Sequence, residues 1–456
     1  MVKRSIPVAG RRYRTIHFAA LGCSKNRVDT EVLAGIAANA GLEVVADPGE
    51  AEVIVVSTCG FIEAAARESI DTLLELSRFK ETGRCRLLVA ASCLVQRHGA
   101  ELADGLPEVD LLVGTQEPSW LERALAGAAA ARLEVGAAGH FLQGPSTPRL
   151  LEPRAASAYV KIADGCSRAC AFCAIPAIRG PMRSRAVDGI VAEARALVAR
   201  GVKELVLVSQ DTAAYGRDRD DGAGLVSLVR ALDRVDGLAW VRLLYLYPDG
   251  VTDDLLACMR DLRTLVPYLD VPVQHASAEV LRRMRRGHGP ARLRRLVERA
   301  RRIVPGIFLR TTVLVGHPGE RDEDFAELLG FVGESRFDRL GVFRYSDEEG
   351  TPSFGTGPVV SPRISYARQR RVLAVQRRIS RELGRALVGS KLDVLVERAA
   401  DDAGWVLEGR HPGQAPEVDG ITYLVDCAAT PGAIVRARVT RATDHDLVAE
   451  PITSGV

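Results

Sequence analysis

The stretch Cys166-Ser-Arg-Ala-Cys170-Ala-Phe-Cys173 places three thiols in one short loop, with three and then two residues between them. It follows the apolar, alternating run Ala158–Ile162 and precedes a basic segment, Arg179 to Arg185. A loop with this spacing can wrap around one metal centre. Four ligands close a structural zinc site or saturate an iron–sulfur cluster, so three leave a coordination position open for chemistry. The alternatives are a zinc knuckle without its last ligand and three unrelated buried thiols.

Size and composition exclude several classes of protein. The 456 residues predict two to four domains that each bury a core, and the hydrophobic fraction of 47% is ordinary for a soluble globular protein. No apolar run approaches the ~20 residues that a membrane span needs. The N-terminus lacks the apolar region of a secretory signal, so we expect residues 1–14 to form a basic tail of a cytoplasmic protein.

The charge balance gives no general argument for nucleic-acid binding, because the net charge is only +3. Two arginine-rich helical stretches, 282–302 and 363–385, are expected to be solvated faces, although arginine also suits phosphate. The nine cysteines are an odd number in a chain with no visible signal, which makes a disulfide framework improbable.

Residues 15–136 alternate short apolar runs with helical patterns, which predicts an open parallel α/β sheet with helices on both faces. We expect Asn26 or Asp29 to cap the first helix and Gly41 to end it. Further helices are expected over Glu63–Arg78 and Trp120–Ala131. The expected strands are Ile16–Leu21, Val53–Ser57, Leu87–Ala91 and Leu111–Gly114.

Three cysteines of this region each follow a predicted strand: Cys23, Cys59 and Cys93. In open parallel sheets the ligand site lies outside the carboxyl ends of the strands, so these thiols are expected to converge on a second three-ligand site. The alternative is that they are buried small hydrophobic residues, as free cysteines often are. The remaining cysteines show no such placement, and we assign them to structure: Cys85, Cys258 and Cys427.

After a glycine- and proline-rich linker, 137–153, the segment 154–387 again alternates strands and helices. Six strands with helices between them predict a (β/α)6 partial TIM barrel, whose site lies at the carboxyl ends of the strands. Among the polar residues at those ends, Ser209 and Gln210 are candidate cofactor contacts. The expected strands are Ala158–Ile162, Glu204–Ser209, Trp240–Leu246, Tyr268–Val273, Phe308–Leu314 and Arg339–Arg344.

A basic amphipathic helix is expected over Pro362–Leu387. The sequence pattern then changes, and the short alternating strands of residues 388–456 predict a small β-barrel. From residue 389 onward this segment has eleven Asp and Glu against six Lys and Arg. A module of this size that binds RNA should be basic, so an acidic one is expected to attract a basic protein. The strands are expected at Lys391–Glu397, Trp405–Gly409, Ile421–Asp426, Ile434–Thr440 and Leu447–Glu450.

The spacing Cys-x3-Cys-x2-Cys resembles the signature of radical S-adenosylmethionine (SAM) enzymes. The order of the three domains resembles the methylthiotransferase family of these enzymes across nearly the full chain, and the last segment resembles its TRAM domain. The match is closest to the branch called RimO, which methylthiolates an aspartate of protein twelve of the small ribosomal subunit. The stretches that carry the resemblance are Leu21-Gly-Cys-Ser-Lys-Asn26, Ser57-Thr-Cys-Gly-Phe-Ile-Glu63, Ala91-Ser-Cys93, Tyr159-Val-Lys-Ile-Ala-Asp-Gly-Cys166 and Ser209-Gln-Asp-Thr212.

The resemblance implies two 4Fe-4S clusters and two SAM molecules per turnover. Cys166, Cys170 and Cys173 would hold the cluster that cleaves SAM, and Phe172 would line the adenine pocket. The cysteines of the first domain would hold an auxiliary cluster that carries the sulfur. The removal of hydrogen from an unactivated carbon then belongs to the cofactor, and no residue is assigned as catalytic.

The resemblance also implies partners: the basic ribosomal protein, alone or on the ribosome, and an electron donor such as flavodoxin or ferredoxin. We expect no membrane association and no direct tRNA binding. Two alternatives stay open. One is a tRNA adenosine methylthiotransferase with the same chemistry, which the acidic C-terminal segment disfavours. The other is a zinc-stabilised nucleic-acid-binding protein, which the incomplete three-ligand sites disfavour.

Overall fold

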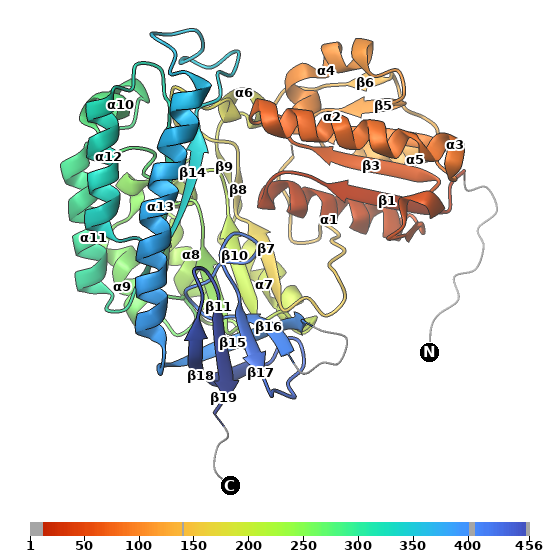
Figure 1. Cartoon of the computed structure of the whole chain (residues 1–456). Helices are drawn as coiled ribbons and strands as arrows, with labels where there is room; N and C mark the ends of the chain where they lie inside the picture. Colours follow the sequence, from red (N-terminus) through yellow and green to blue (C-terminus); the bar gives the residue numbers. More distant parts are fainter. Residues whose placement is uncertain (1–11, 139–140, 401–405, 453–456) are drawn as a thin grey trace. The chain divides into compact units, whose positions relative to one another are not determined.

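The computed structural model describes residues 12–138, 141–400 and 406–452. The chain divides into two compact units, coloured along the sequence in Figure 1. Unit 1 comprises residues up to 151 together with 163–168 and 173–185, and unit 2 comprises 152–162, 169–172 and the chain from 186 onward. Within the described residues, no helix combines the length and the apolar character that crossing a membrane requires.

Unit 1 is built on a parallel sheet of six strands in the order β2-β1-β3-β4-β5-β6. The four predicted strands are present, and two short strands extend the sheet at its edges. The prediction missed β2 and β6 because two residues are too short to show any periodicity. The strands are β1 (Thr15–Ala20), β2 (Glu43–Val44), β3 (Val53–Thr58), β4 (Leu87–Ser92), β5 (Leu111–Val113) and β6 (Leu133–Glu134).

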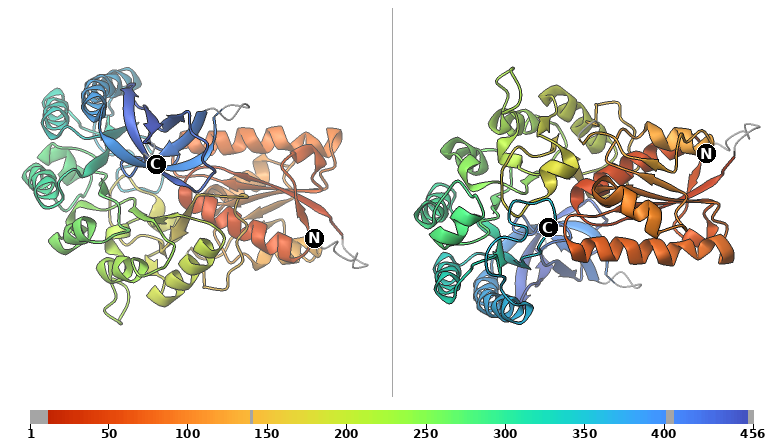
Figure 2. Two further views of the ribbon diagram at one scale, coloured as in Figure 1. Left: turned by 90° about the horizontal axis from the view of Figure 1, so that it is seen from below. Right: turned by 90° about the horizontal axis from the view of Figure 1, so that it is seen from above.

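Helices cover both faces of this sheet (Figures 1 and 2). The central strands therefore alternate their side chains between two cores. Val53 and Val55 pack in one core with the helices α1 and α5, whereas Ile54 and Val56 pack in the other with α2 and α4. The helices are α1 (Ser24–Asn39), α2 (Glu63–Ser77), α3 (Phe79–Thr82), α4 (Cys93–Gly105), α5 (Ser119–Leu125) and α6 (Ile175–Arg179).

The start of α1 differs from the prediction. Cys23 occupies the N-cap position, so neither Asn26 nor Asp29 caps the helix. The side-chain amide of Asn26 instead donates to the carbonyl oxygens of Leu21 and Thr58, at 3.0 and 2.9 Å. Asn26 thus ties together the ends of two strands, which short-range capping rules cannot anticipate.

Unit 1 also holds segments from both sides of the predicted linker. Tyr13 is buried in the sheet core, and Leu150 donates its backbone N–H to Glu31 at 2.9 Å. Farther along the chain, β8 (Ala163–Asp164) and β9 (Arg183–Ser184) pair as a small antiparallel ribbon.

Unit 2 contains the predicted six-stranded partial barrel as two parallel three-stranded sheets, β11-β10-β7 and β12-β13-β14. Leu246 donates its backbone N–H to Asp270 at 2.9 Å and Val241 bridges to Leu265, and these contacts connect the two sheets. The strands are β7 (Ser157–Lys161), β10 (Glu204–Val208), β11 (Trp240–Leu243), β12 (Tyr268–Asp270), β13 (Phe308–Val315) and β14 (Arg339–Arg344).

The helices of unit 2 lie outside these strands (Figure 2). The helices that follow β7 and β10 bury apolar faces, as the periodicity of the sequence predicts. The helices are α7 (Val187–Ala199), α8 (Leu225–Leu232), α9 (Asp253–Asp261), α10 (Ala278–Arg283), α11 (Pro290–Ile303), α12 (Asp322–Ser335) and α13 (Pro362–Leu387).

The C-terminal segment forms a closed five-stranded barrel in the order β15-β16-β17-β19-β18, as predicted. The predicted strand start at Trp405 lies outside the described residues. The strands are β15 (Lys391–Ala399), β16 (Val406–Arg410), β17 (Thr422–Val425), β18 (Ile434–Ala442) and β19 (Leu447–Pro451).

A buried charge network joins this small barrel to the first residues of the large barrel's strands, and we call it the barrel-floor network. Glu204 accepts from Arg242 Nε at 2.7 Å and from Arg410 Nη2 at 2.5 Å. The side chains of these three residues are at most 1% exposed. Because breaking such a network leaves an uncompensated buried charge, it fixes the two barrels of unit 2 to each other.

Candidate metal centres

The structure brings the carboxyl ends of β1, β3 and β4 to one edge of the parallel sheet, and a cysteine follows each of them. Cys23 caps α1, Cys59 follows β3, and Cys93 is the first residue of α4. A Cβ atom on Gly22 would lie 2.9 Å from Cys59 Sγ, and Asn26 Oδ1 lies 3.7 Å from Cys93 Sγ. Each thiol thus follows a strand of the same sheet, and their convergence on one metal site stays a prediction.

No three Cys, His, Asp or Glu side chains in the described ranges meet closely enough to hold a single metal ion. A 4Fe-4S cluster is a wider target, since each thiolate binds a different iron. Three thiolates could bind three irons of such a cluster and would leave the fourth iron without a protein ligand.

Two unusual backbone conformations lie next to the thiols of unit 1. Gly22 has φ of +89°, and a Cβ there would also lie 2.7 Å from Cys59 Cβ, so this turn requires glycine. Ser92, directly before Cys93, has φ of +87°, which is strained for a residue with a Cβ. Such strain costs about 1–3 kcal/mol and is concentrated at functional sites.

The electrostatic surroundings differ among these thiols. Desolvation raises the pKa of Cys59 to about 11, and the neighbouring thiols Cys93 and Cys23 add to the shift. Desolvation also raises the pKa of Cys93, against the opposing charge of Arg179. Desolvation alone would raise the pKa of Cys23 too, but the charge of Lys25 and backbone N–H groups outweigh it, so the net shift is downward. The helix N-termini at Cys23 and Cys93 favour thiolates further.

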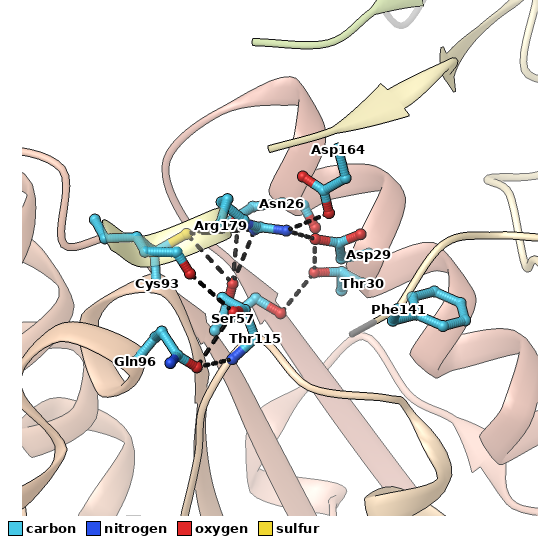
Figure 3. Close-up of polar contacts among 12 residues, drawn as sticks. Asn26, Asp29, Thr30, Ser57, Cys93, Gln96, Thr115, Phe141, Asp164 and Arg179 are labelled. Carbon is cyan, nitrogen blue, oxygen red and sulfur yellow. Dashed lines mark hydrogen bonds and ion pairs between the residues drawn. The ribbon is translucent and has the colours of Figure 1, made fainter. Parts of the chain in front are cut away.

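The side chain of Arg179, at the end of α6, is the centre of the polar contacts beside these thiols (Figure 3). Only 4% of Arg179 is exposed. Its partners are Asp29 Oδ2 at 2.7 Å, Asp164 Oδ2 at 3.2 Å, Asn26 Oδ1 at 2.7 Å, Ser92 Oγ at 3.2 Å and Cys93 Sγ at 3.3 Å. The sequence shows the basic segment that Arg179 begins but does not indicate its role, because the partners of Arg179 lie far away in the chain.

In the cluster loop Cys166–Cys173, local contacts fix Cys166 in unit 1 and Cys170 in unit 2. Cys166 donates its backbone N–H to Gly180 O at 3.0 Å. The preceding Gly165 has φ of +78°, and a Cβ there would lie 2.1 Å from Pro181 O. In unit 2, Arg286 Nη1 donates to Cys170 Sγ at 3.3 Å, and its guanidinium lies 4.0 Å from the Tyr247 ring centroid.

The other predicted cofactor contacts lie in unit 2. Phe172 is half-buried and packs against Val280, Met284 and Leu314. Ser209 is fully buried, and its hydroxyl lies 3.3 Å from Thr212 Oγ1. Gln210 follows it at the carboxyl end of β10. Their roles as cofactor contacts remain predictions.

The loop after β13 shows how one side chain can fix a strand end. Glu320 accepts from the backbone N–H groups of Gly316 and His317, at 2.5 and 3.1 Å, and pairs with Arg368 at 2.9 Å. Desolvation raises the pKa of Glu320, although the charge of Arg368 opposes the shift. We therefore assign Glu320 to shaping the loop.

Three family models match the chain. The radical SAM superfamily matches residues 160–332, an uncharacterised family designated UPF0004 matches 15–114, and the TRAM domain matches 388–452. A solved radical SAM methyltransferase, TsrM from Kitasatospora setae, has the same fold, with a TM-score of 0.55 over 86% of this chain and 78% of that one, at 13% identity.

Two curated relatives are much closer in sequence. The ribosomal protein uS12 methylthiotransferase RimO of Sorangium cellulosum is 49% identical over 96% of this chain and 91% of its own length. The protein of the same description from Anaeromyxobacter sp. strain K is 48% identical over 95% of this chain and 92% of its own.

Fold, cluster loop and family matches together define a radical SAM enzyme of the transferase class, which uses SAM and a 4Fe-4S cluster. Within that class, the chain belongs to the RimO family of methylthiotransferases.

Proposed function

We propose that this enzyme adds a methylthio group to the β-carbon of an aspartate in ribosomal protein uS12, using two 4Fe-4S clusters and two SAM molecules per turnover. The observation that carries the proposal is that Cys23, Cys59 and Cys93 each follow a strand of the same parallel sheet at its carboxyl end, where they could form a second three-cysteine site. One cluster is enough to cleave SAM, so a second site provides a place for the sulfur.

The residues of the cluster loop fit the first cluster. Cys166, Cys170 and Cys173 would hold it, and the positive charge of Arg286 beside Cys170 Sγ favours the thiolate that binds iron. When bound, this cluster supplies the electron that cleaves SAM, which permits removal of hydrogen from an unactivated carbon. A low-potential donor such as flavodoxin or ferredoxin would supply that electron in the cytoplasm.

The residues of unit 1 fit the auxiliary cluster. The three thiols leave one iron without a protein ligand, which suits a position that carries sulfur. The buried sides of Cys59 and Cys93 keep water away from part of the site. Protein side chains here orient and shield the cluster.

The name of the relatives supports uS12 as the substrate, and the acidic C-terminal segment would attract a basic protein. The structure narrows which of its acids are free for docking. Asp419 is buried against Arg310 and Tyr268, and Asp444 pairs with Arg381 at 2.7 Å. Asp426 and Glu450 remain exposed and are the acids that we assign to docking.

The experiment that tests the function compares small-subunit ribosomal proteins and tRNA nucleosides by mass spectrometry, with and without the gene. Loss of a methylthio mass from uS12 alone supports the proposal. Loss from a tRNA adenosine keeps the radical chemistry and overturns the substrate.

Docking has its own test, in which Asp426→Lys and Glu450→Lys are combined in the full chain. We expect a several-fold rise in KM for uS12, with SAM cleavage in the absence of substrate unchanged. An unchanged KM contradicts the docking role of these acids without affecting the proposed reaction.

A further inference from the structure

The contact between Arg179 and Cys93 uses an unusual edge of the guanidinium. Arg179 Nε and Nη2 both lie 3.3 Å from Cys93 Sγ. In proteins, this pair of parallel N–H groups ordinarily binds the two oxygens of a carboxylate or phosphate. Here the forked edge faces one sulfur atom, while Nη1 is left for the carboxylates of Asp29 and Asp164 (Figure 3).

Charge balance does not require the sulfur contact. Nη1 alone contacts both Asp29 and Asp164, so these two ion pairs would be complete without Cys93. Two N–H donors from one rigid guanidinium instead meet a single sulfur, which fixes the position of that sulfur. The arrangement therefore fits Cys93 Sγ held in place as a ligand.

The segment that carries Arg179 is held firmly on both sides. Gly180 O accepts the backbone N–H of Cys166 at 3.0 Å, and Ile178 O accepts from Thr115 Oγ1 at 3.0 Å. Ile178 also packs against Cys93 in a small buried cluster. A guanidinium on so fixed a backbone is pre-organised, and little side-chain freedom is lost when it donates to sulfur.

We propose that Arg179 is a positioning residue of the auxiliary site, which holds Cys93 Sγ in place for iron and makes the bound cluster easier to reduce. The proposal rests on the proposed function, since it takes the unit 1 cysteines to hold a cluster. Hydrogen bonds to cluster sulfur raise the reduction potential, and loss of a group that orients a ligand weakens metal binding about 10–100-fold.

The test uses the full chain with Cys166, Cys170 and Cys173 all changed to Ala, so that only the auxiliary site can hold iron. This parent and its Arg179→Lys variant are reconstituted with iron and sulfide. Iron content, the rate of iron loss to a chelator and the midpoint potential from a redox titration followed by electron paramagnetic resonance are then measured. We expect Arg179→Lys to lose iron about 10–100-fold faster and its potential to shift downward.

The matched control is Arg183→Lys, four residues further along, whose described side-chain bond goes to Phe141 O at 3.1 Å and to no cysteine. It should leave both measurements unchanged. If Arg179→Lys does not fold, judged by circular dichroism, the double variant Arg179→Gln/Asp29→Asn is measured in its place. This variant removes one charge of each sign.

The outcomes separate the two proposals. If the parent takes up no iron, the auxiliary cluster itself is overturned, and the role of Arg179 falls with it. If the parent binds iron but Arg179→Lys keeps its iron and its potential, Arg179 is only a structural ion-pair partner and the proposed function stands.

Discussion

The two three-cysteine sites are built in opposite ways. The cluster loop carries Cys166, Cys170 and Cys173 in one short stretch of sequence, whereas the unit 1 site would take its cysteines from three strand ends. Each site has an arginine that donates to one sulfur, but in different surroundings. Arg179 is buried among carboxylates, while Arg286 is partly exposed, stacks on Tyr247 and donates to Pro272 O at 2.8 Å.

The difference shows what each site depends on. A local loop keeps its spacing wherever the chain puts it, so its geometry depends mainly on the few residues around it. A site assembled from strand ends exists only while the sheet is intact. The two sites should therefore be separable by mutation, and the following predictions test how far that separation extends.

The largest effect should come from the cysteines themselves. Cys170→Ala should abolish both SAM cleavage and methylthio transfer, whereas Cys59→Ala should abolish transfer and retain SAM cleavage. The measurement is 5′-deoxyadenosine and modified uS12 in the same reaction, with buried Cys258→Ala as the control for loss of a thiol elsewhere. Loss of SAM cleavage in a folded Cys59→Ala protein would contradict the independence of the two sites.

Breaking the barrel-floor network should give the next largest effect. Glu204→Gln removes the carboxylate between Arg242 and Arg410, and we expect unit 2 to lose about 3–5 kcal/mol of unfolding free energy. Chemical denaturation measures this loss, with exposed Glu327→Gln on α12 as the matched control. The sheet of unit 1 should unfold as before; an equal loss there would show that the units are not independent.

Lowering the pH should also weaken unit 2, because burial lowers the pKa of His411 to about 3, with nearby arginines adding to the shift. The unfolded chain binds a proton at this histidine below pH 6.5, whereas the folded chain does not. The contribution of His411 to the free energy of unfolding is therefore complete above pH 6.5. About 2 kcal/mol of the free energy of unfolding is lost by pH 5.

The measurement is the unfolding free energy at pH 7 and pH 5. His411→Asn should reduce the pH dependence by this amount, since an amide oxygen can still accept the Gly413 N–H that His411 Nδ1 accepts at 3.0 Å. The control is the unaltered chain measured at the same two pH values. An unaltered slope in His411→Asn would refute the assignment.

The smallest effect on stability should come from Gly22→Ala. The left-handed backbone costs a residue with a Cβ about 1–2 kcal/mol, and the added methyl group must displace Cys59. We expect iron at the auxiliary site to fall while the cluster loop keeps its own. Gly105→Ala, at a helix end with open space around the Cβ position, is the control. Full iron content in Gly22→Ala would show that the site tolerates this movement.

Much of this architecture could be predicted from the sequence because it depends on periodicity. Continuous apolar runs identified β3 and β4, and alternation identified the small barrel. The position of Cys23, Cys59 and Cys93 after three strands followed from those runs, and their convergence on one site is predicted from a rule about the edge of parallel sheets.

The sequence could not predict contacts that depend on a distant partner. Arg179 lies 86 positions after Cys93, and Glu204 meets Arg410 across even more of the chain. Nothing in the local pattern distinguishes these arginines from the solvated ones on α11 and α13. The strained φ of Ser92 was equally invisible, because no residue preference points to it.

The division of the chain into units has a consequence for synthesis on the ribosome. Unit 1 is completed only by residues 163–168 and 173–185, which leave the ribosome after the whole sheet. At about 5–20 residues per second, Arg179 follows Cys93 by on the order of ten seconds. During that interval Asp29 and Cys93 lack their guanidinium partner, so cluster loading should wait for translation past this point. A fragment that ends at the linker would never reach the completed state.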